Sequence, residues 1–169
     1  MKIIGFIATC PQGDKVTYQM VLKGDSCLLV NRKPFFTPDW TQDLRMTPCI
    51  VVRVSRLGKE IAAKFAPRYY DAVANGIDFV AWDKMQAAQQ EGKSWTEAIA
   101  FDYSLAVGTW LTPNLTPEQE QQIHQAIAQA SRVMTIRQGD LIYIQQGREP
   151  VPVKRDEVIE QEGLYCKIK

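Results

Sequence analysis

The chain has 169 residues, of which 46% are hydrophobic and 23% charged, the composition of an ordinary globular protein. Twenty Lys and Arg against nineteen Asp and Glu leave a formal net charge of +1. So small a charge provides no basic field for a nucleic acid or an anionic membrane, and we expect neither as a partner. The length fits one domain, so residues 1–169 are expected to form a single unit.

The N-terminal apolar run, residues 1–8, is too short for a signal peptide and ends at a Pro–Gly turn over 11–14. No stretch approaches the ~20 apolar residues of a membrane span. The four cysteines lie in apolar runs without a C-x-x-C pair: Cys10, Cys27, Cys49 and Cys166. These features predict a cytoplasmic protein with buried, reduced thiols.

Short strands separated by turns are expected in the first third of the chain. Residues 2–8 and 15–22 are apolar or β-branched and flank the turn, which predicts a hairpin. Residues 26–30 indicate a further strand. Residues 35–40 are aromatic and broken by proline, which is typical of an irregular packed segment.

The middle of the chain alternates between strand and helix signals. Residues 49–55 make the strongest strand pattern of the sequence. A short helix is expected over 60–73, interrupted at Pro67. Residues 77–81 then predict a strand that runs directly into a polar helix over 83–91.

The clearest helix start lies at Thr116, which can cap a helix that has proline first and Gln119 third. Apolar residues then recur at helical spacing and mark one buried face: Ile123, Ile127, Ala130 and Met134. Four glutamines lie elsewhere on this helix and need only solvent: Gln121, Gln122, Gln125 and Gln129. Strands are expected over 141–145 and 164–168, with a polar, proline-containing loop over 147–157.

Motifs with a known chemistry are scarce. The sequence contains no Gly-rich phosphate loop, no G-x-S-x-G elbow and no H-E-x-x-H. His124, the one histidine, lies beside the apolar face of the capped helix and favours a structural role. A serine triad or a Cys–His dyad would need this histidine, so neither is expected.

Asp78 is an acidic residue in an otherwise apolar strand, between Ile77 and Phe79. Burying a carboxylate is costly unless a cation or hydrogen-bond donors compensate it. Two interpretations remain open: backbone or arginine donors hold Asp78 for a structural reason, or Asp78 faces a site as a metal ligand. Asp83 and Asp102 are weaker candidates, because each fits a helix cap or a turn.

An ordered series of segments covers nearly the whole chain: 23–29 (KGDSCLL), 33–40 (KPFFTPDW), 58–62 (GKEIA), 68–71 (RYYD), 76–83 (GIDFVAWD), 92–95 (GKSW), 98–104 (AIAFDYS) and 139–143 (GDLIY). Each segment is similar to a motif of the fumarylacetoacetate hydrolase family, and the order is the family's order. The chain therefore resembles a diverged, shortened member, close in type to 2-hydroxyhepta-2,4-diene-1,7-dioate isomerases and acylpyruvases.

This resemblance implies an α+β, mostly β fold: a mixed β-sheet roll of the family's C-terminal-domain type with a few short helices, assembled as a homodimer. It also implies a chemistry. Members bind Mg²⁺ or Mn²⁺ through an E-x-E pair and an aspartate, and they hydrolyse, isomerise or decarboxylate 2-oxo and 2,4-dioxo acids. A hard cation held by carboxylates can still chelate the substrate oxygens and stabilise the enolate.

Aligned with these motifs, the chain departs from the family where the chemistry is carried. Thr47 and Cys49 stand at the E-x-E pair, Trp82 at an arginine, and Ile99 at a lysine, while only Asp78 matches a metal ligand. The residues around the expected site are the candidates for a ligand pocket: Lys23, Ser26, Thr47, Cys49, Trp82, Ile99 and Gln146. Trp82 either fills the vacated pocket or forms a platform for a flat ligand.

Three further regions of the family's site are altered. The H-x-x-E lid is missing, since residues 8–19 contain no His or Glu, and residues 144–147 (IQQG) replace T-G-T-P. Residues 113–120 stand in place of a longer stretch with substrate contacts. One such change could be repaired, but their coincidence indicates that the chemistry is no longer maintained.

The preferred hypothesis is a catalytically degenerate homologue, a pseudoenzyme with no cofactor. Losing an outer-sphere partner alone costs about 10- to 100-fold in metal affinity or activity, and two lost ligands should cost more. The scaffold would then bind a small 2-oxo-acid-like ligand or serve assembly. The alternative is a functioning Mg- or Mn-dependent hydrolase, isomerase or decarboxylase, with Glu60, Glu97 or Asp102 as substitute ligands and Asp83 or Lys84 assisting.

Overall fold

A computed structural model describes residues 1–9, 16–146 and 149–169. Most of the strands join one mixed sheet in the order β2-β1-β7-β4-β5-β6-β3, with β8 paired to β4. The strands of this sheet are β1 (Ile3–Thr9), β2 (Thr17–Lys23), β3 (Leu28–Val30), β4 (Leu44–Val54), β5 (Tyr70–Ala81), β6 (Leu105–Val107), β7 (Leu141–Gln145) and β8 (Val151–Pro152). A separate hairpin consists of β9 (Val158–Gln161) and β10 (Leu164–Lys167).

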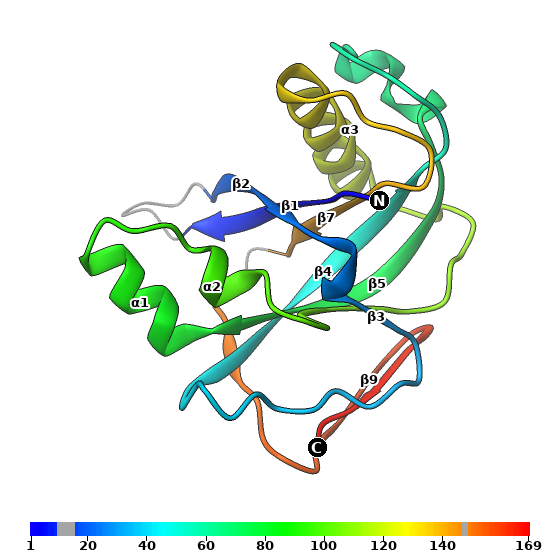
Figure 1. Cartoon of the computed structure of the whole chain (residues 1–169). Coiled ribbons are helices and arrows are strands. Elements are labelled where there is room, and N and C mark those ends of the chain that lie inside the picture. The colour runs from blue at the N-terminus through cyan, green and yellow to red at the C-terminus, as the bar shows by residue number, and fades with distance from the viewer. Residues whose placement is uncertain (10–15, 147–148) are drawn as a thin grey trace.

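The two longest strands, β4 and β5, run diagonally across the molecule and pair antiparallel (Figure 1). β1 lies parallel to β7, and β3 parallel to β6, so the sheet is mixed. In the β4–β5 register Thr47 lies opposite Asp78, and Cys49 lies opposite Gly76. Since side chains alternate between faces along a strand, these four residues share one face of the sheet.

Helix α3 (Pro117–Val133) covers the opposite face beside β1 and β7 (Figure 1). Thr116 and Gln119 form the reciprocal capping box expected from the sequence. The apolar stripe of the helix is buried against sheet residues of the same cluster: Ile4, Phe6, Ile50, Val52, Ile142 and Ile144. Apolar periodicity and cap chemistry agree here, so the helix forms where local signals place it.

Helices α1 (Trp82–Gln90) and α2 (Thr96–Ile99) pack on the face that carries Asp78, where they contact Val80. The β9–β10 hairpin packs on the other face, against Ile77 and Phe79. On the Asp78 face the aromatic ring of Tyr143 packs against Gly5 of β1. A Cβ on Gly5 would come within 2.2 Å of that ring, so only glycine leaves room for it.

The expected hairpin of β1 and β2, the strand over 141–145 and the final strand are confirmed. The helix expected over 60–73 is wrong in extent: a 3₁₀ helix spans Ala63–Arg68, Pro67 included, and β5 already begins at Tyr70. The loop expected over 147–157 contains the short β8. Strands β6 and β9 and helix α2 were not expected, because segments of three or four residues carry no measurable periodicity.

Three of the cysteines, Cys27, Cys49 and Cys166, are buried free thiols, as expected. Cys10, the turn at 11–14 and residues 147–148 lie outside the described residues. Within the described ranges, no helix is long and apolar enough to span a membrane.

Candidate functional site

The centre of the site is a buried ion pair between Lys23 and Asp78. The Lys23 Nζ atom lies 2.6 Å from Asp78 Oδ1, and the two side chains are 0% and 1% exposed. Lys23 ends β2 at the edge of the sheet, and Asp78 lies in the interior strand β5. The ammonium also donates to the carbonyl oxygen of Ser104 at 3.1 Å and to its Oγ at 3.0 Å. Three protons therefore meet three acceptors, and the charge is fully compensated.

Gln145 holds the other oxygen of the carboxylate. Its Nε2 donates to Asp78 Oδ2 at 2.7 Å, and its Oε1 accepts from the backbone N–H of Ala8 at 2.9 Å. Ser104 in turn donates from its Oγ to the carbonyl oxygen of Ile99. Each group in this network has a defined partner, which makes the network rigid.

Two buried hydroxyls beside the ion pair have no partner. Within the described part of the chain, neither Thr47 Oγ1 nor the Tyr143 hydroxyl makes a hydrogen bond. Burial, reinforced by the negative charge of Asp78, raises the pKa of Tyr143 well above its ordinary value. Burial likewise raises the pKa of Cys49 well above its ordinary value; Asp78 adds to this shift and Lys23 opposes it. Both groups are therefore neutral at physiological pH.

A cavity of about 230 Å³ opens beside Asp78 and Gln145. Its walls come from the ends of β1, β5 and β7, from helix α1, and from the residues before α2 and β8. They are Ile7, Ala8, Thr9, Asp78, Val80, Trp82, Met85, Gln89, Trp95, Gln145 and Pro150. We refer to it as the Trp82 cavity. It is mainly apolar, with the Asp78 carboxylate and the Gln145 amide as its buried polar groups.

Trp82 is held in place from outside this cavity. The guanidinium carbon of Arg45 lies 5.0 Å from the Trp82 ring centroid. Asp43 fixes the guanidinium, which donates from Nε at 3.0 Å and from Nη2 at 2.8 Å. The hydrogen bond to Asp43 is also the main reason that the pKa of Arg45 is raised. A cation stacked on an indole face stabilises one orientation of the ring.

The structure brings together some of the pocket candidates named from the sequence and separates others. Of the seven candidates only Trp82 is among the described residues that line the cavity, while Lys23, Thr47 and Cys49 are buried around Asp78 without lining it. The other three candidates belong to neither group. Ser26 is exposed in the 3₁₀ helix Asp25–Cys27, Ile99 is the buried last residue of α2, and Gln146 donates to the carbonyl oxygens of Ile144 in β7 and Pro48 in β4.

The residue that completes the site is Gln145, one position before the candidate Gln146. Along β7 the residues Leu141, Tyr143 and Gln145 face the same interior as Asp78. A strict two-residue alternation from Tyr143 would have selected Gln145 from the sequence. Trp95 and Ser104 lie in short irregular stretches near α2, and no local sequence signal points to them.

The residues present do not fit a divalent metal ion. Both carboxylate oxygens of Asp78 are already bonded, to an ammonium and to an amide. In the parts of the chain that the structure describes, no three His, Cys, Asp or Glu side chains gather as a set of metal ligands. The substitute ligands considered from the sequence, Glu60, Glu97 and Asp102, are all exposed.

Asp83, considered above as an assistant in catalysis, has a structural role. It accepts hydrogen bonds from Thr41 Oγ1 at 2.5 Å and from the backbone N–H of Gln42 at 3.3 Å. Burial opposes the shift, but these hydrogen bonds lower the pKa of the Asp83 carboxyl. Asp83 thus ties the loop before β4 to the first turn of α1.

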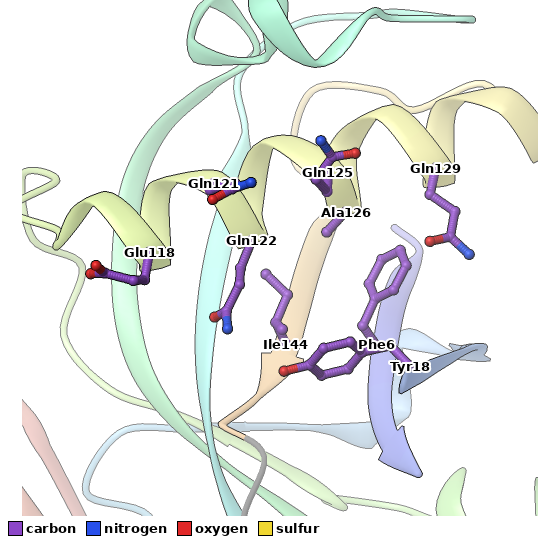
Figure 2. A pocket seen from close by; sticks show the side chains of 9 residues that line it. All are labelled: Phe6, Tyr18, Glu118, Gln121, Gln122, Gln125, Ala126, Gln129 and Ile144. Atoms are coloured by element: carbon purple, nitrogen blue, oxygen red, sulfur yellow. The ribbon is translucent and has the colours of Figure 1, made fainter. Parts of the chain in front are cut away.

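A second cavity of about 320 Å³ lies on the opposite face, between α3 and strands β1, β2 and β7. Figure 2 shows Gln122 and Gln129 extending from α3 toward the sheet, above Phe6, Tyr18 and Ile144. Of the four glutamines predicted to face solvent, Gln121, Gln125 and Gln129 are exposed, yet all four line this cavity. The cavity shares no residue with the ion-pair network.

No protein-family model and no curated protein matches the sequence. Solved structures do match it in fold, and each alignment covers 99% of this chain. A candidate fumarylpyruvate hydrolase from Burkholderia cenocepacia superposes with a TM-score of 0.85 at 16% identity over 88% of its own chain. The fumarylpyruvate hydrolase from Pseudomonas aeruginosa in complex with Mn²⁺ and pyruvate gives 0.80 at 16% over 88%. The 2-hydroxyhepta-2,4-diene-1,7-dioate isomerase from Mycobacterium marinum gives 0.78 at 19% over 73%.

These likenesses define the class of fold. The chain is an α+β, mostly β protein with the mixed sheet of the fumarylacetoacetate hydrolase type, as the sequence motifs imply. The chain thus has the fold of proteins described as hydrolases and isomerases.

Proposed function

We propose that this chain is a catalytically degenerate relative of the fumarylacetoacetate hydrolase family, in which Lys23 neutralises Asp78 in place of a divalent metal. The observation that carries the proposal is the 2.6 Å contact between two fully buried, opposite charges. The structural interpretation of Asp78 is therefore favoured over the metal-ligand interpretation. The compensating donors are a lysine and a glutamine, not the backbone or arginine groups expected from the sequence.

Electrostatics supports this proposal. A divalent ion at Asp78 would have to enter beside a buried ammonium that already has its counter-charge. At an assumed separation of 4 Å and an effective dielectric constant of 20, the repulsion is about 8 kcal/mol. Binding at about 1 µM supplies a comparable free energy, about 8 kcal/mol, so the repulsion would cancel it. Deprotonating Lys23 would remove the repulsion but leave a neutral amine in the network.

The groups that would perform the chemistry are also replaced. Buried, neutral Cys49 and Thr47 stand at the positions of two carboxylate ligands. Buried Ile99 stands at a lysine position and offers only its backbone carbonyl, which Ser104 already uses. The scaffold keeps a cavity at this site, so binding of a small ligand without turnover is the function that the site supports best. Homodimer formation and a cytoplasmic location stay predictions from the sequence.

Turnover assays with an acylpyruvate and with oxaloacetate test the proposal. The protein should add nothing to the background rate with Mn²⁺ or Mg²⁺ alone, which must be measured because free metal ions promote decarboxylation. Asp78→Ala serves as the matched control. A metal-dependent rate that rises with protein concentration and disappears in Asp78→Ala would refute the proposal and establish the alternative, a functioning enzyme.

A further inference from the structure

We propose that the Trp82 cavity binds a small, uncharged aromatic molecule. The inference rests on the proposed function, because it takes the charge of Asp78 to be balanced from within the protein. It also differs from the expectation of a 2-oxo-acid-like ligand. The argument uses the cavity's size, its walls and its charge.

The size fits one or two aromatic rings. An apolar cavity of about 150 Å³ is large enough to hold benzene. The Trp82 cavity, at about 230 Å³, has room for a ring with a short polar substituent or for a fused pair of rings. It is smaller than the pockets of about 300–1,000 Å³ that take drug-sized ligands.

The walls favour an aromatic ligand over an aliphatic one. Trp82 and Trp95 both line the cavity, together with the buried apolar side chains of Ile7, Val80 and Met85. Indole rings offer offset or edge contacts to another ring, which strengthen binding beyond simple burial. Methionine adds a favourable sulfur–aromatic contact.

The Trp82 ring is ordered before any ligand arrives. Arg45 stacks on it and is itself clamped by Asp43, and neither residue belongs to the cavity lining. A ring that is already fixed loses little conformational freedom on binding. The Arg45–Asp43 ion pair, which does not line the cavity, thus contributes to affinity by positioning the Trp82 indole.

The charge distribution selects against an anion. Of the described residues that line the cavity, Asp78 alone carries a charge, and its partner Lys23 lies behind it with 0% exposure. A ligand carboxylate would meet the carboxylate of Asp78 first. The remaining polar groups are uncharged: the amide of Gln89, the hydroxyl of Thr9 and the amide of Gln145. They suit a ligand with an amide, phenol or indole N–H.

Ligand-observed NMR with two isosteric probes, benzamide and benzoate, tests this inference. We expect benzamide to bind about tenfold more tightly than benzoate, the factor that ~1.4 kcal/mol represents. Indole should bind at least as tightly as benzamide. Tighter binding of benzoate than of benzamide would overturn the inference. So would the absence of binding of any probe at about 10 mM, ten times the dissociation constant of about 1 mM that marks weak binding.

Variants locate the site. Trp82→Ala should weaken benzamide binding about tenfold or more. Trp40→Ala, which removes a tryptophan in edge-to-face contact with Phe101 outside the cavity lining, should change it less than about twofold. Trp82→Leu removes the aromatic ring but keeps an apolar side chain at this position, and it serves if Trp82→Ala does not fold. Equal loss in the Trp40 and Trp82 variants would place the probe elsewhere and refute the inference.

Adding Mn²⁺ and pyruvate to the same assay distinguishes failure of this inference from failure of the proposed function. If Mn²⁺ makes pyruvate bind in the same assay, the proposed function fails together with the inference. If Mn²⁺ has no effect and benzamide and indole do not bind, the ion-pair account stands and only the ligand class is wrong.

Discussion

Replacing Lys23 by methionine should cost a large share of the free energy of unfolding. The substitution keeps most of the buried aliphatic volume but leaves Asp78 without its cation, 1% exposed and bonded only to Gln145. Removing one partner of a buried ion pair costs about 3–5 kcal/mol. For a domain of this length this corresponds to a fall in melting temperature of about 6–20 °C.

The matched double variant makes the test specific. In Lys23→Met/Asp78→Leu no uncompensated charge is left, so most of the loss should be recovered; apolar replacement of a buried pair is often neutral or stabilising by about 1–4 kcal/mol. Lys93→Met, which removes an exposed ion pair with Glu91, should cost well under about 1 kcal/mol. Urea unfolding at pH 7, followed by circular dichroism, gives the free energies of the parent, Lys23→Met, Asp78→Leu, the double variant and Lys93→Met.

The coupling energy between positions 23 and 78 decides the matter. We expect the double variant to be more stable than the sum of the two single losses by at least about 2 kcal/mol. Additive losses, or single variants as mild as Lys93→Met, would refute the claim that the two charges depend on each other.

Three further predictions concern packing, acid stability and thiol reactivity. Gly5→Ala should destabilise the protein by about 1–3 kcal/mol in urea unfolding, because the new Cβ collides with the Tyr143 ring, whereas Gly24→Ala, with open space around it, should be nearly neutral. The free energy of unfolding should fall as the pH drops below about 4. Burial raises the pKa of Asp140, but hydrogen bonds from Lys2 outweigh this and hold that pKa below its ordinary value of 3.8. The contribution of Asp140 to stability is therefore complete above 3.8 and is lost as the pH falls through the pKa of the folded protein. An Asp140→Asn variant that loses stability in acid as steeply as the parent would contradict this. At pH 8, iodoacetamide should leave Cys166 unmodified in the native protein. Burial raises the pKa of Cys166 to about 11, so only about one molecule in 1,000 carries the thiolate at this pH. Rapid modification, measured by peptide mass spectrometry, would contradict this and show that the β9–β10 hairpin opens.

Elements with strong local signals could be predicted from the sequence. The β1–β2 hairpin and α3 form where alternation, turn residues and cap chemistry agree. The strand predicted at 49–55 is in fact the C-terminal half of β4, which extends back to Leu44 through Pro48. Pro48 hides the continuity of that strand, because a proline inside a strand ordinarily indicates an edge or an end.

The site was only partly predictable, for a physical reason. Asp78 could be singled out, since a carboxylate in an apolar strand requires compensation. The motif over 23–29 makes Lys23 a pocket candidate, but Lys23 lies 55 residues from Asp78, and the pairing of the two arises only through tertiary folding. The motif alignment predicts Gln146 as a pocket residue, whereas the alternation of β7 selects Gln145, one position earlier. No sequence pattern predicts that the Tyr143 hydroxyl is buried without a hydrogen-bond partner among the described residues.

The central claim is that an internal ammonium takes the place of a metal at Asp78, and a thermal shift with Mn²⁺ and then EDTA tests it most directly. A bound metal at 100 times its dissociation constant stabilises by about 2.7 kcal/mol, a rise of roughly 5–10 °C for a domain of this size. The account predicts no shift in the parent protein. A rise of that order, reversed by EDTA and absent in Asp78→Asn, would contradict it and return Asp78 to the role of a metal ligand.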